Sequence, residues 1–294
     1  LTSSTAVQAI SVNLDAGNDI TTLNSRIGGL DASMVGINLK AARDVTITSS
    51  AFETYGGAMT IDSGRDFTLT ATTGNGAILS TAGCSTPSSV DCRSGPYTEG
   101  GLQTITAVGT VKVEANAYGG QGVALFSSGG QQISADNIEI RGGLQGIGND
   151  AWITNRSATV AQTISAHTIL LQAGGASSTN PSDQDNDAGI FSRTALQTIN
   201  VTGTGGSLTL NGGGGGHYNA AVIQAGTGNQ PITGGQEINI HGGGSLILNG
   251  GNAVGSAQTF AQISSYSDQT INIYDGGSIT LTGGAGNGTV LDKD

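Results

Sequence analysis

A repeating unit constrains the fold of this chain more than any other feature of its sequence. The segment "QTINVTGTGGSLTLNGG", which starts at Gln197, has close variants in "QEINIHGGGSLILNGG" from Gln236 and "QTINIYDGGSITLTGG" from Gln269. A glutamine shortly before an isoleucine marks these units and recurs at Gln8, Gln103, Gln132, Gln162, Gln197, Gln236 and Gln269. Internal periods of roughly 20–50 residues indicate solenoids, propellers or arrays.

Each unit contains three short segments in which apolar and polar residues alternate. Glycine, asparagine or aspartate separates these segments, which is the pattern of short β-strands joined by turns. Three strands per unit predict an all-β, right-handed parallel β-helix of about nine coils, with the hand taken from the general rule for parallel crossovers. We expect one domain over residues 1–294, with irregular coils and a cysteine loop over 1–100 and regular repeats over 101–294.

Alternation within a strand decides which side chains face the core of such a coil. We therefore expect one inward stack in each of three sheets. The first comprises Ile105, Ile133, Ile164, Ile199, Ile238 and Ile271. The second comprises Leu208, Leu210, Leu246, Leu248, Ile279 and Leu281, and the third comprises Ile153, Ile190, Val222 and Ile263. In the N-terminal third, coils are expected to start at Ile10, Ile37 and Ile61.

The same alternation places the repeated glutamines on the inward side. A buried amide without hydrogen-bond partners costs about 1–3 kcal/mol. Two arrangements avoid this cost: an amide ladder from coil to coil, or a corner position from which each glutamine reaches solvent or backbone. Glycine pairs after the second strand are expected at equivalent bends, because glycine permits positive φ and close backbone approach. These pairs are Gly142–Gly143, Gly174–Gly175, Gly212–Gly213, Gly250–Gly251 and Gly283–Gly284.

Composition excludes several classes of protein and partner. The chain has 50 glycines in 294 residues but only 4 prolines, and glycine does not recur at every third position, so a collagen-like structure is excluded. A net charge of −11 argues against a nucleic-acid partner. No run of about 18 apolar residues occurs, so we expect no membrane insertion. Charged residues make up only 11% of the chain, and a surface of neutral polar groups suits a secreted protein.

From about Gln103 onward, the repeats resemble the filamentous-haemagglutinin-like exoproteins of Gram-negative two-partner secretion. The resemblance rests on "LQTINVTGTGGSLTLNGGGGGHYNAAVIQA" and its neighbours, whereas the family's "NPNG"-type secretion element does not occur in this sequence. The resemblance implies a long β-helix at the bacterial cell surface that acts as an adhesin or a surface fibre. The chain would then correspond to a repeat segment or to a different β-helical surface protein.

Two local segments are candidates for a specific role. Cys84 and Cys92 enclose a short polar loop, and a disulfide between them would imply an oxidising compartment, with two free thiols as the alternative. Asp183, Asp185 and Asp187 alternate in "NPSDQDNDAG". Calcium favours alternating carboxylates in a loop, and a solvated polar loop without metal is the alternative. No other cofactor is expected.

A catalytic site does not emerge from the sequence. Polysaccharide-acting enzymes bring paired carboxylates or a basic residue into one groove. Lys112, Glu114, Glu139 and Arg141 are expected outward on successive coils, where cross-strand ion pairing is the simpler interpretation. Trp152 is also expected to face outward, where it contacts a sugar or a protein partner unless a neighbouring loop covers it.

Partners are expected at the ends of the rod and along its surface. Unpaired strand edges invite pairing, so we expect end-to-end self-association or continuation of a longer chain. A host-surface or matrix glycan is the other expected partner. The sequence thus favours a non-enzymatic, extracellular structural or adhesive protein. A polysaccharide lyase or hydrolase, and a non-catalytic carbohydrate- or calcium-binding module, are the alternatives.

Overall fold

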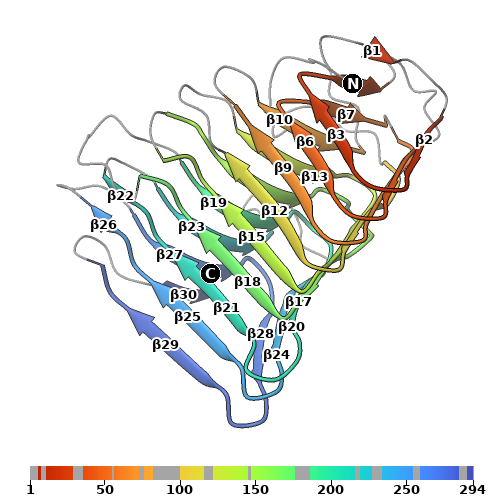
Figure 1. Ribbon diagram of the computed structural model, residues 1–294. Helices are drawn as coiled ribbons and strands as arrows, with labels where there is room; N and C mark the ends of the chain where they lie inside the picture. Colours follow the sequence, from red (N-terminus) through yellow and green to blue (C-terminus); the bar gives the residue numbers. More distant parts are fainter. Residues whose placement is uncertain are drawn as a thin grey trace.

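The computed structural model contains β-strands and no helix over the residues that it describes. The described residues are 6–7, 11–28, 36–54, 56–72, 76–81, 100–115, 122–144, 147–175, 186–215, 219–226, 234–253, 259–284 and 290–293. The strands form one elongated stack of coils, with the N-terminal strands in red at one end and the last strands in blue at the other (Figure 1).

Most strands of the described residues belong to three parallel sheets, numbered here by the order in which a coil visits them. The first sheet consists of β2 (Ser11–Ala16), β5 (Gly36–Ala41), β8 (Ala58–Ser63), β11 (Gln103–Ala107), β14 (Gln131–Ser134), β17 (Gln162–Ala166), β20 (Gln197–Val201), β24 (Gln236–Ile240) and β28 (Gln269–Ile273). The second consists of β3 (Ile20–Leu23), β6 (Val45–Thr48), β9 (Phe67–Ala71), β12 (Thr110–Ala115), β15 (Asn137–Arg141), β18 (Thr168–Gln172), β21 (Ser207–Asn211), β25 (Ser245–Asn249) and β29 (Ser278–Thr282). The third consists of β1 (Ala6–Val7), β4 (Arg26–Gly28), β7 (Ala51–Glu53), β10 (Ala77–Ser80), β13 (Val123–Ser127), β16 (Ala151–Asn155), β19 (Ala188–Ser192), β23 (Ala221–Ala225), β27 (Ala261–Ser265) and β30 (Val290–Lys293).

Apart from the strands at the two ends of each sheet, every strand pairs in parallel with its counterpart one coil earlier and one coil later. The coil of β17, β18 and β19 shows the pattern, because these strands pair in register with β20, β21 and β23 of the next coil. Neighbouring coils are therefore about 4.8 Å apart along the axis. The prediction of a right-handed parallel β-helix with about nine coils of three short strands is confirmed. A minor sheet joins β22 (Gly214–Gly215) to β26 (Asn252–Ala253).

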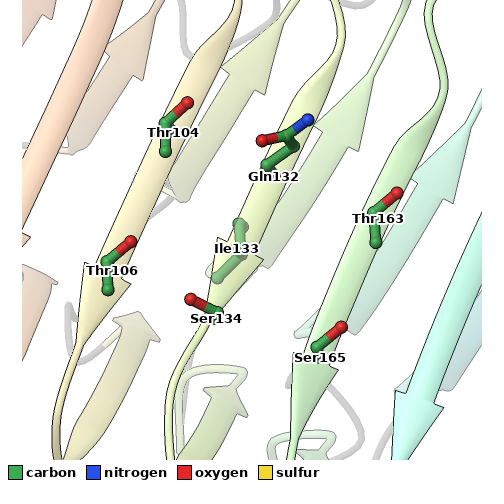
Figure 2. Close-up of a pocket in the computed structure, with 7 residues that line it drawn as sticks. All are labelled: Thr104, Thr106, Gln132, Ile133, Ser134, Thr163 and Ser165. Atoms are coloured by element: carbon green, nitrogen blue, oxygen red, sulfur yellow. The ribbon is translucent and has the colours of Figure 1, made fainter.

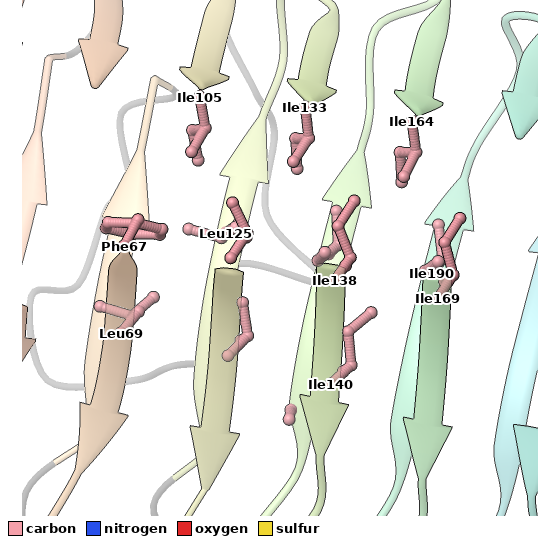
Figure 3. Packing of buried hydrophobic residues seen from close by; sticks show 14 of the residues in the cluster. Phe67, Leu69, Ile105, Leu125, Ile133, Ile138, Ile140, Ile164, Ile169 and Ile190 are labelled. Carbon is pink, nitrogen blue, oxygen red and sulfur yellow. The ribbon is translucent and has the colours of Figure 1, made fainter. Parts of the chain in front are cut away.

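Aliphatic side chains fill the interior of the coils in columns (Figure 3). The expected first-sheet stack is confirmed, with Ile271 of the last coil partly buried and the others fully inside. In the second sheet Leu208, Leu210, Leu246 and Leu248 are fully buried. Ile279 and Leu281 continue their columns but are 53% and 49% exposed, since β29 has a partner on one side only among the described strands. Division into a single domain stays a prediction.

In the third sheet, the prediction that Val222 belongs to the inward stack is wrong. Ile223 is fully buried and pairs with Ile190 on one side and Ile263 on the other. Val222 lies on the outer side of β23, opposite Gly189 of β19. The segment offers two adjacent branched residues, and alternation alone does not choose between them.

The N-terminal coils also differ from the predicted register. Ile61 pairs with Leu39 of the preceding coil and not with Ile37, which pairs with Met59. All four side chains are buried and apolar, so both inward columns are aliphatic in these coils. The predicted start at Ile10 lies outside the described residues, as does Gln8.

An amide ladder runs inside the first sheet, which confirms the first of the two alternatives for the glutamines. The Nε2 of each glutamine donates to the Oε1 of the glutamine one coil earlier over 2.6–2.8 Å, in Gln131, Gln162, Gln197, Gln236 and Gln269. The second member of the ladder is Gln131 and not Gln132, which is exposed. The ladder begins at Gln103, whose Nε2 lies 3.8 Å from the sulfur of Met59.

The glycine pairs lie at one corner of the coil, where backbones approach closely. A Cβ added to Gly174 would lie 1.7 Å from the carbonyl oxygen of Gly143, and one added to Gly213 would lie 2.1 Å from that of Gly174. The stack therefore contains Gly174 and not Gly175, which shifts one predicted pair by one residue. Close approach is the main reason for glycine here, because only Gly175 among the predicted pairs has positive φ, at 68°.

Candidate binding surfaces

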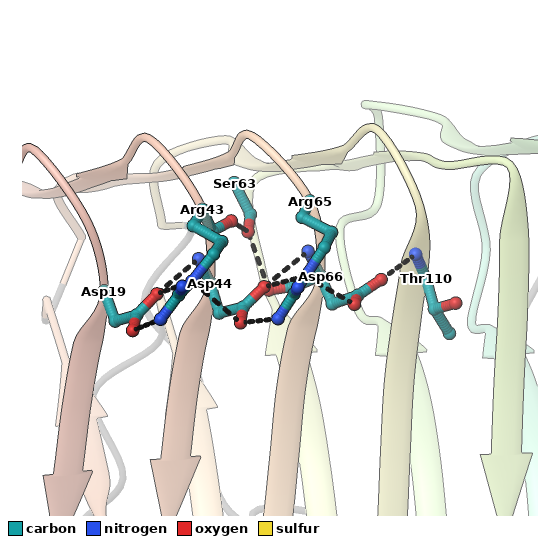
Figure 4. A network of polar contacts seen from close by, with 7 residues as sticks. All are labelled: Asp19, Arg43, Asp44, Ser63, Arg65, Asp66 and Thr110. Carbon is teal, nitrogen blue, oxygen red and sulfur yellow. Dashed lines mark hydrogen bonds and ion pairs between the residues drawn. The ribbon is translucent and has the colours of Figure 1, made fainter.

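Charged side chains form a row of ion pairs along one corner of the N-terminal coils (Figure 4). We call this row the charged zipper; it consists of Asp19, Arg43, Asp44, Arg65 and Asp66. Arg43 donates from Nε to Oδ1 of Asp19 at 2.8 Å and from Nη2 to Oδ2, and Arg65 makes the same two bonds to Asp44. The hydrogen bond from Arg43 holds the pKa of Asp19 below its ordinary value. The last carboxylate, Asp66, accepts a backbone N–H from the following coil at 2.8 Å. These charges are paired with one another along the axis, so the charged zipper is part of the scaffold.

Insertions leave the regular coils at the glycine corner, between the second and third strands. At each insertion, one glycine of the corner stack donates its backbone N–H to the carbonyl oxygen of the residue at which the chain re-enters the coil. These pairs are Gly143 with Asn149, Gly174 with Asn186, Gly213 with Asn219 and Gly251 with Thr259. This hydrogen bond joins the two residues between which the insertion leaves and re-enters the coil. Insertions of different lengths are therefore compatible with the same coil.

The re-entry asparagines form a second buried ladder, which sequence reasoning missed. The Oδ1 of Asn186 accepts the backbone N–H of Asn149 at 3.2 Å, and the Oδ1 of Asn219 accepts that of Asn186 at 3.0 Å. All three residues are fully buried. Their signal in the sequence is the repeated "NDA" before the third strand, at residues 149–151 and 186–188.

Asp187, one of the three predicted calcium ligands, has structural partners. Its Oδ1 accepts the N–H of Ala220 at 2.7 Å, and its own N–H donates to the Oδ1 of Asp150 at 3.0 Å. Asp183 and Asp185 lie outside the described residues, so the calcium site stays a prediction. Over the described part of the chain, no group of three or more His, Cys, Asp or Glu side chains is placed to hold a metal ion.

Trp152 points outward from β16 and is half-buried. Its ring lies over Gly189 in the next coil, where an added Cβ would sit 2.0 Å from Cζ3. Glycine at this position thus makes room for the ring to lie against the sheet. The role of Trp152 as a surface contact stays a prediction. Cys84 and Cys92 lie outside the described residues, so their disulfide stays a prediction as well.

The outward charges on β12 and β15 pair differently from the expected cross-strand pattern. Lys112 Nζ lies 2.7 Å from Glu114 Oε2, and Arg141 Nε lies 3.0 Å from Glu139 Oε2. Both ion pairs join residues two apart in the same strand, although Lys112 and Glu139 are register partners. Partly exposed pairs of this kind contribute at most about 1 kcal/mol to stability.

A further charged cluster lies on the outer face of the first sheet and was missed from the sequence. Asp15, Lys40 and Asp62 occupy register-paired outward positions on β2, β5 and β8, and all three are exposed. Lys40 therefore stands between two carboxylates that are two coils, or about 9.6 Å, apart along the axis. The irregular spacing of the N-terminal coils conceals this alignment.

The same face becomes neutral in the following coils, where it holds an open depression of about 240 Å³. Figure 2 shows its side chains in two columns on β11, β14 and β17. We call this surface the hydroxyl trough; its lining residues are Thr104, Thr106, Gln132, Ile133, Ser134, Thr163 and Ser165. Alternation predicts that the polar residues among them face outward, but nothing in the sequence marks the depression.

One of the two outer columns, that of Ser165, continues beyond the trough as an amide ladder. Asn200 Nδ2 donates to Ser165 Oγ at 3.2 Å, Asn239 Nδ2 donates to Asn200 Oδ1 at 3.2 Å, and Asn272 Nδ2 donates to Asn239 Oδ1 at 2.8 Å. Hydrogen bonds between coils therefore hold side chains on the outer face of the first sheet as well as inside it.

Glu53 is a buried carboxyl group on the third sheet. Its side chain is 3% exposed and accepts a hydrogen bond from Arg26 Nη2 at 2.7 Å. Burial raises the pKa of Glu53, and the charge of Arg26 opposes that rise. The free energy of unfolding should therefore depend on pH through the ionisation of Glu53 beside Arg26.

Over the described residues, no helix has the length and apolar character needed to cross a bilayer. In comparisons with known proteins, no family model, curated protein or solved structure matches the chain. The resemblance to the filamentous-haemagglutinin-like exoproteins therefore stays a prediction from the repeats.

Proposed function

We propose that the chain is an extracellular structural and adhesive protein, a stiff β-helical rod that displays columns of side chains at a bacterial cell surface. The observation that carries this proposal is the glutamine ladder, which links six coils by side-chain hydrogen bonds from Gln103 to Gln269. Each coil contacts only its neighbours, so stiffness depends on the bonds between adjacent coils. Buried amide bonds add to the backbone ladder at every step.

Composition and pattern support the location and the role. Only 11% of the residues are charged, and the outer columns of the central coils consist of hydroxyl and amide side chains. The repeats resemble surface exoproteins that serve as adhesins or fibres. A host-surface or matrix glycan is the proposed ligand of the rod.

The proposal includes a partner at the C-terminal face of the rod, either a further copy or a continuing chain. The glutamine column favours a coil that carries glutamine, because Gln269 donates to Gln236 and a glutamine in a further coil would extend the same series of bonds. In the N-terminal coils that column holds Val12, Ile37 and Met59, which offer no amide donor. Coils that carry glutamine in this column would therefore extend the ladder, whereas the N-terminal coils of a second copy would not. We favour a continuing chain over a second copy for this reason.

Imaging combined with an adhesion assay tests the proposal. We expect electron micrographs of the purified chain to contain straight particles roughly 40–45 Å long, and beads coated with the folded chain to adhere to cell-surface or matrix material. Beads coated with heat-denatured chain serve as the control. Flexible or collapsed particles, or equal adhesion of both bead preparations, would contradict it.

A polysaccharide-acting enzyme is the second candidate, and one observation favours it. Asp15 and Asp62 flank Lys40 on the exposed face of the first sheet, at a separation near that used by inverting glycosidases. Release of reducing sugar or of an unsaturated product from a polysaccharide, abolished in Asp62→Asn and retained in an Asp66→Asn control, would establish this alternative. No product release by the folded chain would exclude it for the substrates tried.

A further inference from the structure

We propose that the hydroxyl trough binds an extended, neutral polysaccharide. This inference rests on the adhesive function proposed above and names the class of ligand that the rod would hold. Its basis is the charge, the hydrogen-bonding chemistry and the spacing of the outer face of the first sheet.

Charge selects a neutral ligand. The outward positions of β11, β14, β17 and β20 carry no charged side chain, in a chain whose net charge is −11. Carboxylates bound this neutral stretch at both ends, because Asp62 pairs with Thr106 and Glu237 pairs with Thr198. An anionic glycan lying along the columns would meet one carboxylate at each end, whereas a neutral one would not.

The chemistry of the lining matches a ligand rich in hydroxyl groups. A serine or threonine hydroxyl both donates and accepts hydrogen bonds, and the amide of Gln132 offers both functions at separate atoms. The β-branched threonines have restricted χ1 angles, so their hydroxyls are held in place before a ligand arrives. The trough therefore presents preset partners to the hydroxyls of a sugar.

The spacing favours an extended chain lying along the rod. Successive coils place new pairs of side chains about 4.8 Å apart along the axis, and the two columns are about 6.6 Å apart. The axial step is close to the length that one hexose adds to an extended β-linked glucan. The depression lies where Ser134, a small side chain, stands between Thr106 and Ser165. A flat, straight track of this kind suits a ribbon-like glycan better than a coiled one.

Titration calorimetry with three oligosaccharides tests the inference on the whole chain. The probes are cellohexaose as the extended neutral glycan, maltohexaose as a coiled neutral one and hexagalacturonate as an acidic one. We expect saturable binding of cellohexaose, weaker binding of maltohexaose and no binding of hexagalacturonate. Ser134→Ile, which fills the depression with a residue that favours strands, should weaken cellohexaose binding at least tenfold. Thr163→Val, which keeps the shape and removes one hydroxyl, should weaken it several-fold.

Thr209→Ile is the matched control, because Thr209 faces outward from β21 on the second sheet. It should bind cellohexaose like the wild type, and circular dichroism should show that all variants are folded. Equal affinity of the wild type and Ser134→Ile, or no saturable binding of cellohexaose, would overturn the inference. Tighter binding of hexagalacturonate would overturn the charge argument. Adhesion of coated beads without cellohexaose binding would refute this inference and leave the proposed function standing.

Discussion

Replacing a glutamine at the centre of the ladder should destabilise the rod more than replacing the glutamine at its start. Gln197 is fully buried and sits in the middle of the ladder. Its Nε2 donates to Gln162 Oε1 at 2.8 Å, and its Oε1 accepts from Gln236 Nε2 at 2.6 Å. The same Nε2 also lies 3.3 Å from the carbonyl oxygen of Gln224. Gln197→Leu keeps a side chain of similar size and removes both ladder bonds together with this longer one, so it isolates the contribution of the amide.

The two broken ladder bonds have different costs. The Oε1 of Gln162 loses its donor, and a buried polar atom left without a partner costs about 1–3 kcal/mol. The Nε2 of Gln236 keeps the carbonyl oxygen of Ser264 at 3.2 Å, so its loss is nearer that of one net hydrogen bond, about 0.5–1.5 kcal/mol. Gln197→Leu should therefore lower the free energy of unfolding by about 2–4 kcal/mol.

Gln103→Leu is the matched control at the start of the ladder. In the preceding coil the ladder position is held by Met59, so replacing Gln103 leaves only Gln131 Nε2 without its ladder acceptor. That group retains a longer contact to Leu125 O at 3.5 Å. The expected cost is about 1 kcal/mol. Replacing all six glutamines by leucine should cost less than the sum of the single changes, because no amide is then left unpaired.

Urea unfolding followed by circular dichroism measures these differences, with hydrogen exchange of the first-sheet amides as a local readout. A Gln197→Leu variant no less stable than Gln103→Leu would contradict the ladder's role in stability. A six-fold replacement that cost as much as the summed single changes would contradict the cost assigned to unpaired amides.

Three other predictions concern the buried acid, the glycine corner and an asparagine–glycine step. Because the pKa of Glu53 is raised, its contribution to stability is full below the unfolded pKa and declines as pH rises through the folded one; Glu53→Gln should remove that decline in unfolding curves measured from acid to neutral pH. Gly213→Ala would place a Cβ 2.1 Å from the carbonyl oxygen of Gly174 and should lower the free energy of unfolding by about 1–3 kcal/mol, seen as a lower urea midpoint. Deamidation at Asn249–Gly250 requires attack of the glycine nitrogen on the asparagine side chain, yet that N–H is bonded to a carbonyl of the next coil at 2.8 Å. Mass spectrometry should therefore find slower deamidation there in the folded chain than in urea, and equal rates would contradict the bonding.

The fold was predictable because alternation and repetition specify it together. The inward isoleucines from Ile105 to Ile271 and the amide ladder both follow from residues that recur two apart in each unit. The predicted inward residue was wrong where two adjacent residues were equally suitable for the core. Two adjacent glutamines in β14 and two adjacent branched residues in β23 each allow a shift of one position, and only the pairing between coils resolves it.

The candidate surfaces were much less predictable, because they depend on which residues of distant units lie side by side. Asp15, Lys40 and Asp62 align only when the N-terminal register is known, and that register differs from the predicted one by two residues. The hydroxyl trough consists of side chains that are common at any strand surface. Its depression brings Ser134 together with Thr106 and Ser165, which are 28 and 31 residues away in sequence.

Disulfide trapping across neighbouring coils tests the register of the rod most directly. In a background without the native cysteines, Thr163→Cys with Thr198→Cys places two thiols at register-paired outward positions of β17 and β20. Strand neighbours about 4.8 Å apart satisfy the Cα separation of a disulfide, whereas Gln132→Cys with Thr198→Cys spans two coils, about 9.6 Å, and does not. Mass spectrometry of the oxidised monomer should therefore detect the first crosslink in high yield and not the second. Efficient formation of the second crosslink, or failure of the first in the folded chain, would contradict the coil-over-coil stacking on which the account depends.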